Sequence, residues 1–286
     1  MKYYIKEMRP HHWIKNILVF AALACSGHLF SASGVIKGLW GFAAFCFISS
    51  AVYFINDIRD VEKDRKHPEK CKRPIASGKI PVRNACITAG ILFLLAALCN
   101  LMVFEPVASV IIAVYFLLNL GYSLGLKNVP LLDVTILVSG FIFRILYGAI
   151  ITNIEISNWL YLTVIAAAFY FSLGKRRNEL KRTSPGNTRT VLNYYSESFL
   201  DKNMYMCLAL TNIFYALWSM DEKTVEAYGS RCLIWTVPIV LVICMKYSLD
   251  VEGDSDGDPV EVVIHDKVLS VLCIAYLALM LAILYF

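Results

Sequence analysis

The sequence predicts an all-α fold of the polytopic membrane class. Of the 286 residues, 58% are hydrophobic and 17% are charged, whereas soluble domains average about 45–50% and about 25%. The hydrophobic residues fall in long runs that recur from one end of the chain to the other. None of the nine cysteines forms a CxxC pair, so they predict neither a metal site nor a redox site. These observations exclude a secreted disulfide scaffold and a disordered chain.

The apolar runs define the predicted membrane-spanning helices. Such a helix needs about 20 apolar residues, with a range of about 17–25. The nine predicted spans are 14–32, 38–55, 84–104, 107–123, 131–151, 158–174, 203–220, 231–247 and 268–286. Glu105 and Pro106 alone separate the third and fourth spans, which predicts a tight helical hairpin because proline ends a helix at the residue before it. A turn from Gly125 to Pro130 separates the fourth span from the fifth.

Basic residues predict the orientation of these spans. If the N-terminus is cytoplasmic, nearly all of the 27 Lys and Arg residues fall in inner segments. The outer segments then hold only Lys37, Lys223 and Arg231, and Arg144 lies within a span. The positive-inside rule therefore predicts a protein of the cell (inner) membrane with a cytoplasmic N-terminus and an outer C-terminus. The basic loops also account for the net charge of +5, so no nucleic-acid partner is expected.

An acidic cluster directly follows the second span. Asp57, Asp60 and Asp64 have the spacing i, i+3, i+7, so on a helix they share one face. Three carboxylates on one face repel one another unless a hard cation neutralises them, and Mg²⁺ binds carboxylates together with substrate phosphates. The alternative is a solvated helix end, because basic residues alternate with the acids. We favour catalytic metal ligands, since ionisable residues at a membrane edge commonly serve function.

The same segment resembles a known family. The pattern N-D-x-x-D-x-x-x-D over 56–64, followed by R-P-I-A-S-G over 73–78, is similar to the first aspartate motif of the UbiA superfamily of intramembrane polyprenyl-group transferases. The resemblance covers essentially the whole chain and implies one such domain over 1–286, with nine spans and an inner N-terminus. It also implies Mg²⁺ as the cofactor, holding a diphosphate at the cytoplasmic loops. Asn56, Arg65 and Arg73 join the predicted substrate-binding residues on this basis.

The second site departs from the family pattern. Ordinary members carry a second D-x-x-x-D motif just after the sixth span, whereas 171–179 here reads F-S-L-G-K-R-R-N-E. Lys175 and Arg176 would attract phosphate directly, because arginine offers a bidentate fork and lysine a point charge. The alternative is the ordinary basic character of an inner loop. The substitution resembles the branch of decaprenyl-phosphate phosphoribosyltransferases, which implies phosphoribosyl pyrophosphate and a polyprenyl phosphate as substrates.

Further segments over 9–16, 122–144 and 246–266 are similar to that branch. They supply the remaining predicted substrate-binding residues: Lys15, Tyr122, Lys127, Asp133, Arg144, Tyr247, Asp250, Glu261 and Asp266.

Several of these residues also have structural interpretations. Lys15 enters the first span at its inner edge, where a lysine can snorkel. Tyr122 and Tyr247 can act as interfacial anchors. Asp133 and Arg144 could pair within the fifth span, but their i, i+11 spacing separates them by about 16 Å along a helix. We therefore favour phosphate binding by Arg144, because an ionisable group at that depth normally faces a polar cavity.

Together these features predict Mg²⁺-dependent transfer of a 5-phosphoribosyl group from phosphoribosyl pyrophosphate to a polyprenyl (decaprenyl) phosphate, within the lipid membrane. The products would be pyrophosphate and polyprenylphosphoryl-5-phosphoribose for cell-envelope glycan synthesis. One alternative is a prenyltransferase that moves a polyprenyl diphosphate onto an aromatic acceptor of a quinone or haem pathway, and the altered second motif argues against it. Another is a transporter for an anionic solute. The concentration of charge at one membrane face and the lack of a clear internal repeat argue against that class.

Overall fold

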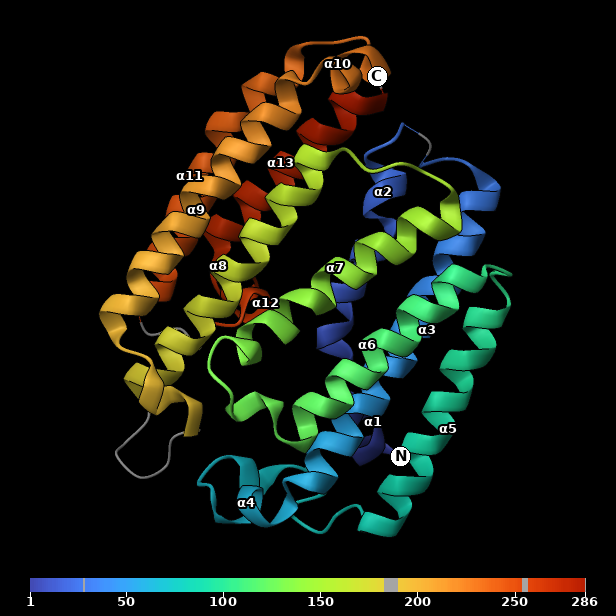
Figure 1. The fold of residues 1–286 in the computed structure, drawn as a ribbon, viewed down its shortest axis with the longest axis vertical. Helices are drawn as coiled ribbons and strands as arrows, with labels where there is room; N and C mark the ends of the chain where they lie inside the picture. The colour runs from blue at the N-terminus through green and yellow to red at the C-terminus, as the bar shows by residue number, and fades with distance from the viewer. Residues whose placement is uncertain (28, 183–189, 254–256, 286) are drawn as a thin grey trace. The chain divides into compact units, whose positions relative to one another are not determined.

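The computed structural model describes residues 1–27, 29–182, 190–253 and 257–285, and the regular elements within these ranges are all helices (Figure 1). The predicted all-α class is therefore confirmed. By the contacts within the chain, the helices form two compact units. Unit 1 consists of Met1–Leu23 and Leu29–Ile154, and unit 2 consists of Ala24–His28 and Glu155–Phe286. One domain over 1–286 stays a prediction.

Unit 1 contains the N-terminal helices and four long ones. Its elements are α1 (Lys2–Met8), η1 (Pro10–Phe20), α3 (Ala32–Arg59), α4 (Val61–Lys66), η2 (Lys70–Lys72), α5 (Val82–Leu101), α6 (Pro106–Leu124), η3 (Leu126–Asn128) and α7 (Leu132–Thr152). The short helix α2 (Ala21–Ala24) crosses from unit 1 into unit 2.

Unit 2 contains the C-terminal helices. Its elements are α8 (Asn158–Arg182), η4 (Thr190–Tyr194), α9 (Glu197–Met220), α10 (Glu222–Tyr228), η5 (Cys232–Thr236), α11 (Val237–Glu252), α12 (Pro259–His265) and α13 (Lys267–Tyr285).

Among the described residues, six helical segments are long and apolar enough to cross a membrane: α3, α5, α6, α7, the continuous η5–α11 segment and α13. They coincide with the predicted second to fifth, eighth and ninth spans, so the polytopic membrane class is confirmed. The predicted sixth and seventh spans correspond to α8 and α9, which are long enough but more polar, since α8 ends in a basic run and α9 begins with a charged turn.

The predicted first span, 14–32, is not one continuous helix. Residues 10–20 form the 3-10 helix η1, and α2 follows it for a single turn. Gly27 then has a φ of 76°, in the left-handed region that a right-handed helix cannot contain. The next helix, α3, begins after Ser31. The Ser31 hydroxyl accepts a hydrogen bond from the Gly34 amide at 3.4 Å and thereby caps α3.

The core of unit 1 lies around α3, which contacts α1, η1, α5, α6 and α7. Phe45 and Tyr147 are fully buried there and meet edge to face at 5.1 Å. The Tyr147 hydroxyl donates a hydrogen bond to Asn100 Oδ1 at 2.9 Å, so its polar atom is satisfied inside the apolar core. Gly148 lets α7 approach η1 so closely that a Cβ atom there would lie 1.9 Å from the carbonyl oxygen of Val19. The α7–η1 contact is therefore made between backbones.

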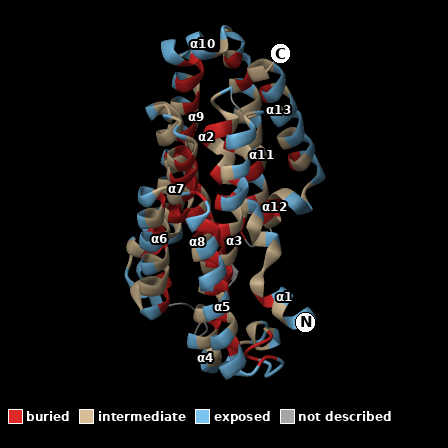
Figure 2. Ribbon diagram, turned by 90° about the vertical axis from the view of Figure 1, so that its right-hand side faces the viewer, coloured by how far each residue is buried: buried red, intermediate tan, exposed pale blue. Residues whose placement is uncertain are grey.

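In unit 2 the helices α8 and α9 lie side by side as a hairpin (Figure 1). Its core contains Tyr215, Trp218, Leu233 and Met280. Large apolar residues remain exposed on α5, α6, α11 and α13, and Figure 2 shows exposed residues along the outer faces of these helices. Exposed apolar surface of this extent is typical of a surface that faces lipid.

Candidate active site

The acidic cluster lies where α3 ends. Asp57 is in the last turn of α3, and its side chain is 1% exposed. The α-helical conformation is interrupted at Asp60, and a new helix, α4, begins at Val61 and carries the buried Asp64. Because of this interruption, the three carboxylates do not converge on one point. Asp57 and Asp64 are brought together, whereas Asp60 binds another partner.

Arg73 joins the two aspartates that converge. Its Nη1 lies 3.0 Å from Asp57 Oδ1 and 2.6 Å from Asp64 Oδ2. The segment 73–78 holds Arg73 there by a local turn, in which the Ser77 amide donates to the Arg73 carbonyl at 2.8 Å. Ile75 is buried in the core beneath the turn and anchors it. The R-P-I-A-S-G motif therefore presents one guanidinium to two carboxylates.

These contacts test whether a divalent cation fits. A cationic nitrogen already stands within hydrogen-bonding distance of oxygens from both Asp57 and Asp64. Carboxylate oxygens are the ligands Mg²⁺ prefers, and Mg²⁺ usually takes one or two of them and completes its shell with water and phosphate. The two aspartates therefore fit such an ion. The predicted set of three is not assembled, since no three His, Cys, Asp or Glu side chains in the described part of the chain group as a metal site would.

Asp60 binds a lysine from a distant part of unit 1. Its Oδ2 lies 2.5 Å from the Nζ of Lys127, which belongs to η3 between α6 and α7. This ion pair ties the acidic end of α3 to the α6–α7 connection. It also brings two residues of the predicted site into direct contact.

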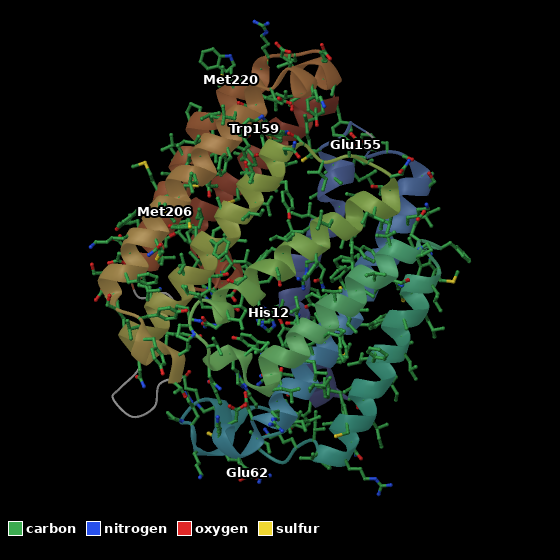
Figure 3. All side chains as sticks on the ribbon, viewed as in Figure 1. His12, Glu62, Glu155, Trp159, Met206 and Met220 are labelled. Carbon is green, nitrogen blue, oxygen red and sulfur yellow. The ribbon has the colours of Figure 1, made fainter. Side chains whose placement is uncertain are left out.

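The remaining predicted residues at this end of unit 1, Asn56 and Arg65, bind different partners. Asn56 donates through Nδ2 to Asp57 Oδ1 at 3.3 Å. Arg65 instead pairs with Glu62 at 2.8 Å. The Glu62 side chain is 74% exposed, and Figure 3 shows it at the outer edge of the α4 end. Arg65 also donates to the Ala76 carbonyl at 3.4 Å, so it supports the 73–78 turn.

Arg144 lies in the middle of α7 among neutral groups. Its Nε donates to Asn16 Oδ1 at 2.7 Å, and its Nη1 donates to the Gly140 carbonyl at 2.5 Å. The guanidinium also lies over the rings of Phe45 and Tyr115, 5.2 and 5.1 Å from their centroids. These contacts hold η1, α3, α6 and α7 together, and they satisfy the guanidinium within unit 1. Phosphate binding by Arg144 stays a prediction.

The other predicted residues of unit 1 lie at the start or end of helices or in η1. Tyr122 is in the last turn of α6, Asp133 is buried in the first turn of α7, and Lys15 is in η1. Each of them has an interaction partner.

The basic cluster of unit 2 is neutralised by carboxylates. Lys175 Nζ lies 3.1 Å from Asp258 Oδ2, and the Lys175 side chain remains 35% exposed. Arg176 is fully buried, and its Nη1 lies 2.8 Å from Glu179. Arg177 forms an ion pair with Asp201. Lys175 is therefore the most accessible of the three cations.

A second ion-pair network in unit 2 contains two predicted residues. Lys246 pairs with Asp250 and lies 2.7 Å from Asp266. Hydrogen bonds from Lys246 and from the Leu269 amide keep the pKa of Asp266 below its usual value. Asp266 thereby also caps the start of α13.

Tyr247 and Glu261 complete the predicted residues of unit 2. Tyr247 is buried against Tyr170 and Phe171, with ring centroids 5.6 and 5.0 Å away, and its hydroxyl donates to the Gly257 carbonyl at 3.4 Å. Glu261 lies 3.5 Å from His265 on α12. Tyr247 is therefore a buried packing residue and does not act as an interfacial anchor.

Two residues at the acidic end of unit 1 were missed by the sequence analysis. Arg9, with a left-handed φ of 53°, places Nη2 2.5 Å from Asp57 Oδ2. Glu7 in α1 is 1% exposed and forms a side-chain hydrogen bond with Asp57. Burial, and then this bond, raise the pKa of Glu7 to about 8. The signal in the sequence was that Glu7 is the one acidic residue in the basic segment 1–16.

Comparisons with known proteins show which proteins the chain resembles. The sequence pattern of the UbiA prenyltransferase family matches residues 17–176. A decaprenyl-phosphate phosphoribosyltransferase of Corynebacterium glutamicum is 36% identical over 279 residues, which are 95% of this chain and 83% of that protein. One from Mycolicibacterium smegmatis is 33% identical, covering 99% of this chain and 92% of that protein. A solved UbiA homolog from Archaeoglobus fulgidus bound to GPP and Mg²⁺ has the same fold, with a TM-score of 0.73 at 17% identity over 99% of both chains.

Proposed function

The chain belongs to the UbiA prenyltransferase family, and from that membership we propose that it transfers a 5-phosphoribosyl group from phosphoribosyl pyrophosphate to decaprenyl phosphate or a similar polyprenyl phosphate. The observation that carries the proposal is similarity over nearly the full length to two decaprenyl-phosphate phosphoribosyltransferases. The basic residues 175–177 support it, because they stand where prenyl-diphosphate-binding members are expected to carry acids.

Asp57 and Asp64 are the residues that would hold Mg²⁺. When bound, the ion would neutralise negative charge on the pyrophosphate of the donor. Arg73 and Arg9 lie against the same aspartates, and their guanidinium groups can each offer two parallel hydrogen bonds to phosphate oxygens. This end of unit 1 is therefore suited to bind a pyrophosphate that carries several negative charges.

The proposed reaction is a substitution at the anomeric carbon. The bond from that carbon to the pyrophosphate oxygen breaks, and a bond to an oxygen of the lipid phosphate forms on the opposite face, so the configuration inverts. The attacking phosphate is already an anion at neutral pH, and the step needs no general base. The protein has to position the two substrates and stabilise the charge that develops on the leaving pyrophosphate.

Lys175 is the residue of unit 2 that we assign to phosphate binding. Its ammonium group is partly exposed, whereas Arg176 is fully buried and paired with Glu179. Arg176 would then act by holding this end of α8 in place. Arg144, engaged by Asn16 and Gly140, would likewise act by fixing η1 against α7.

The orientation follows from the substrates. Phosphoribosyl pyrophosphate is water-soluble and made in the cytoplasm, so the acidic end of α3 would face that side, with an inner N-terminus. The positive-inside distribution of Lys and Arg supports this orientation. Nine crossings in one domain are part of the same proposal.

A transfer assay tests the proposed function. Purified protein in detergent receives Mg²⁺, phosphoribosyl pyrophosphate labelled in the ribose, and decaprenyl phosphate, and the label that enters the organic phase is counted. We expect Mg²⁺-dependent transfer, with a loss of about 100-fold or more in Asp57→Asn and Asp64→Asn. Glu62→Gln is the control, because this exposed acid lies in the same segment, and it should retain transfer.

Two results would contradict the proposal. If no label reaches the lipid, but the protein turns over a prenyl diphosphate with an aromatic acceptor, the prenyltransferase alternative replaces this proposal. Transfer that is unchanged in Asp57→Asn would remove the assigned cation site.

A further inference from the structure

Asp258 has no role in the site as assigned so far, yet it binds the lysine that we assign to phosphate binding. Its Oδ2 lies 3.1 Å from Lys175 Nζ, and its side chain is 3% exposed. Asp250 and Asp266, which the sequence analysis selected in the same part of the chain, pair with Lys246. Asp258, by contrast, contacts the basic cluster that begins at Lys175.

The backbone next to Asp258 rests directly on α8. Gly257, the residue before it, has a φ of 74°. A Cβ atom at Gly257 would lie 2.9 Å from the carbonyl oxygen of Gly174 and 3.0 Å from the Cα of Lys175, so the two backbones are in contact. The Tyr247 hydroxyl donates a hydrogen bond to the Gly257 carbonyl at 3.4 Å. Asp258 is therefore held against the same turn of α8 that carries Lys175.

The carboxylate of Asp258 is fixed at both oxygens. Its Oδ1 accepts a hydrogen bond from the Val260 amide at 3.1 Å and caps the start of α12, while Oδ2 faces Lys175. A lysine has a flexible four-carbon stem and three N–H donors. A buried carboxylate that takes one of these donors fixes the ammonium group and leaves the others for a phosphate. The Lys175 side chain is 35% exposed, so a ligand can reach it.

We propose that Asp258 is a positioning residue of the phosphoribosyl transfer, which holds the Lys175 ammonium group in the place where it receives a substrate phosphate. The inference rests on the proposed function and adds a residue outside the predicted set. Asp258 acts through Lys175 and does not itself contact a substrate. Because the lysine is held before the substrate binds, less conformational freedom is lost at the moment of binding.

A double-mutant cycle in the transfer assay tests the proposal. Asp258→Asn removes the negative charge but keeps a side-chain oxygen that can cap α12. We expect it to lower the transfer rate about 10- to 100-fold in the otherwise unchanged protein. In Lys175→Gln, which has no ammonium group to position, the same substitution should change the rate by less than about twofold. Asp221→Asn is the control, because Asp221 stands in the same N-cap position of α10 in unit 2, and it should retain transfer.

Chemical modification of Lys175 gives a second readout that needs no turnover. An amine-reactive reagent is added to the full-length protein in detergent, and the modified peptide that contains Lys175 is quantified by mass spectrometry over time. We expect faster modification in Asp258→Asn, because the amine is no longer bonded to a buried carboxylate. Thermal unfolding checks that this variant is folded. If it is not, Asp258→Ser takes its place, since serine also caps a helix without a charge.

The possible results separate this inference from the proposed function. Equal modification of Lys175 with and without Asp258→Asn would overturn the inference. Equal losses of transfer in the presence and absence of the Lys175 ammonium group would overturn it too, because additive losses mean that the two residues act independently. In both cases transfer by the unchanged protein leaves the proposed function standing. If the unchanged protein transfers no phosphoribosyl group, the proposed function fails and the role of Asp258 in transfer fails with it.

Discussion

Replacing Gly148 by alanine tests the backbone contact between α7 and η1. The added Cβ would lie 1.9 Å from the Val19 carbonyl oxygen and 2.8 Å from its carbonyl carbon. Because close carbon–oxygen contacts are about 3.3 Å or longer, the two helices would have to separate by roughly 1.4 Å. Overpacking a core costs about 1–3 kcal/mol, and we expect the upper end of that range, since the obstacle is backbone and cannot rotate away.

The separation would also reach the site. The helix η1 carries Asn16, which accepts a hydrogen bond from Arg144, and it directly follows Arg9, which pairs with Asp57. We therefore expect Gly148→Ala to lower both the temperature of thermal unfolding in detergent and the rate of transfer.

Gly90→Ala is the control for this substitution. Gly90 also lies inside a long helix, α5, but a Cβ there would meet nothing within 4 Å. Alanine inside a helix is more stable than glycine by about 0.5–1 kcal/mol, so this variant should unfold at the same temperature or a higher one. If Gly148→Ala were as stable as Gly90→Ala, the close approach of α7 to η1 would be refuted.

Three further predictions concern single groups. Tyr147→Phe leaves the buried Asn100 Oδ1 without its donor and should destabilise the protein by about 1–3 kcal/mol in thermal unfolding; no change would contradict the buried bond. Arg73→Lys keeps the charge but loses the planar fork, so transfer should fall while Gly90→Ala remains active. The pKa of Glu7 is raised from 4.5 to about 8. In EDTA, the stability that this shift contributes is fully present below pH 4.5 and is lost as the pH rises through 8. The unfolding temperature of the unchanged protein should therefore fall over this range relative to that of Glu7→Gln, and parallel profiles would contradict the shift.

Much of the fold could be predicted because its signal is local. A run of about 20 apolar residues forms a helix in a membrane whatever lies elsewhere in the chain, and in the described part of the chain six of the nine predicted spans are long apolar helices. The prediction of the first span as one continuous helix was wrong because an apolar run does not show where the backbone takes a positive φ. Gly27 and Arg9 both do so, and they divide the N-terminal segment into short helices.

The site was predictable to the same extent. Asp57 and Asp64 are close in the sequence, and the R-P-I-A-S-G turn places Arg73 against both of them through short-range contacts. The partners of the other charges come from distant segments. Lys127 is 67 residues from Asp60, and Asp258 is 83 residues from Lys175. Spacing within one segment cannot reveal such pairs, and the same limit hid Glu7 and Arg9.

The most direct test of the central claim is a competition between the two reactions in one tube. The protein is given Mg²⁺, phosphoribosyl pyrophosphate, decaprenyl phosphate, a prenyl diphosphate and an aromatic acceptor, and the lipid products are identified by mass spectrometry. Phosphoribosyl transfer predicts a lipid whose mass is that of decaprenyl phosphate plus one phosphoribosyl group, formed in equal amount with pyrophosphate. A prenylated aromatic product, with decaprenyl phosphate unchanged, would contradict it.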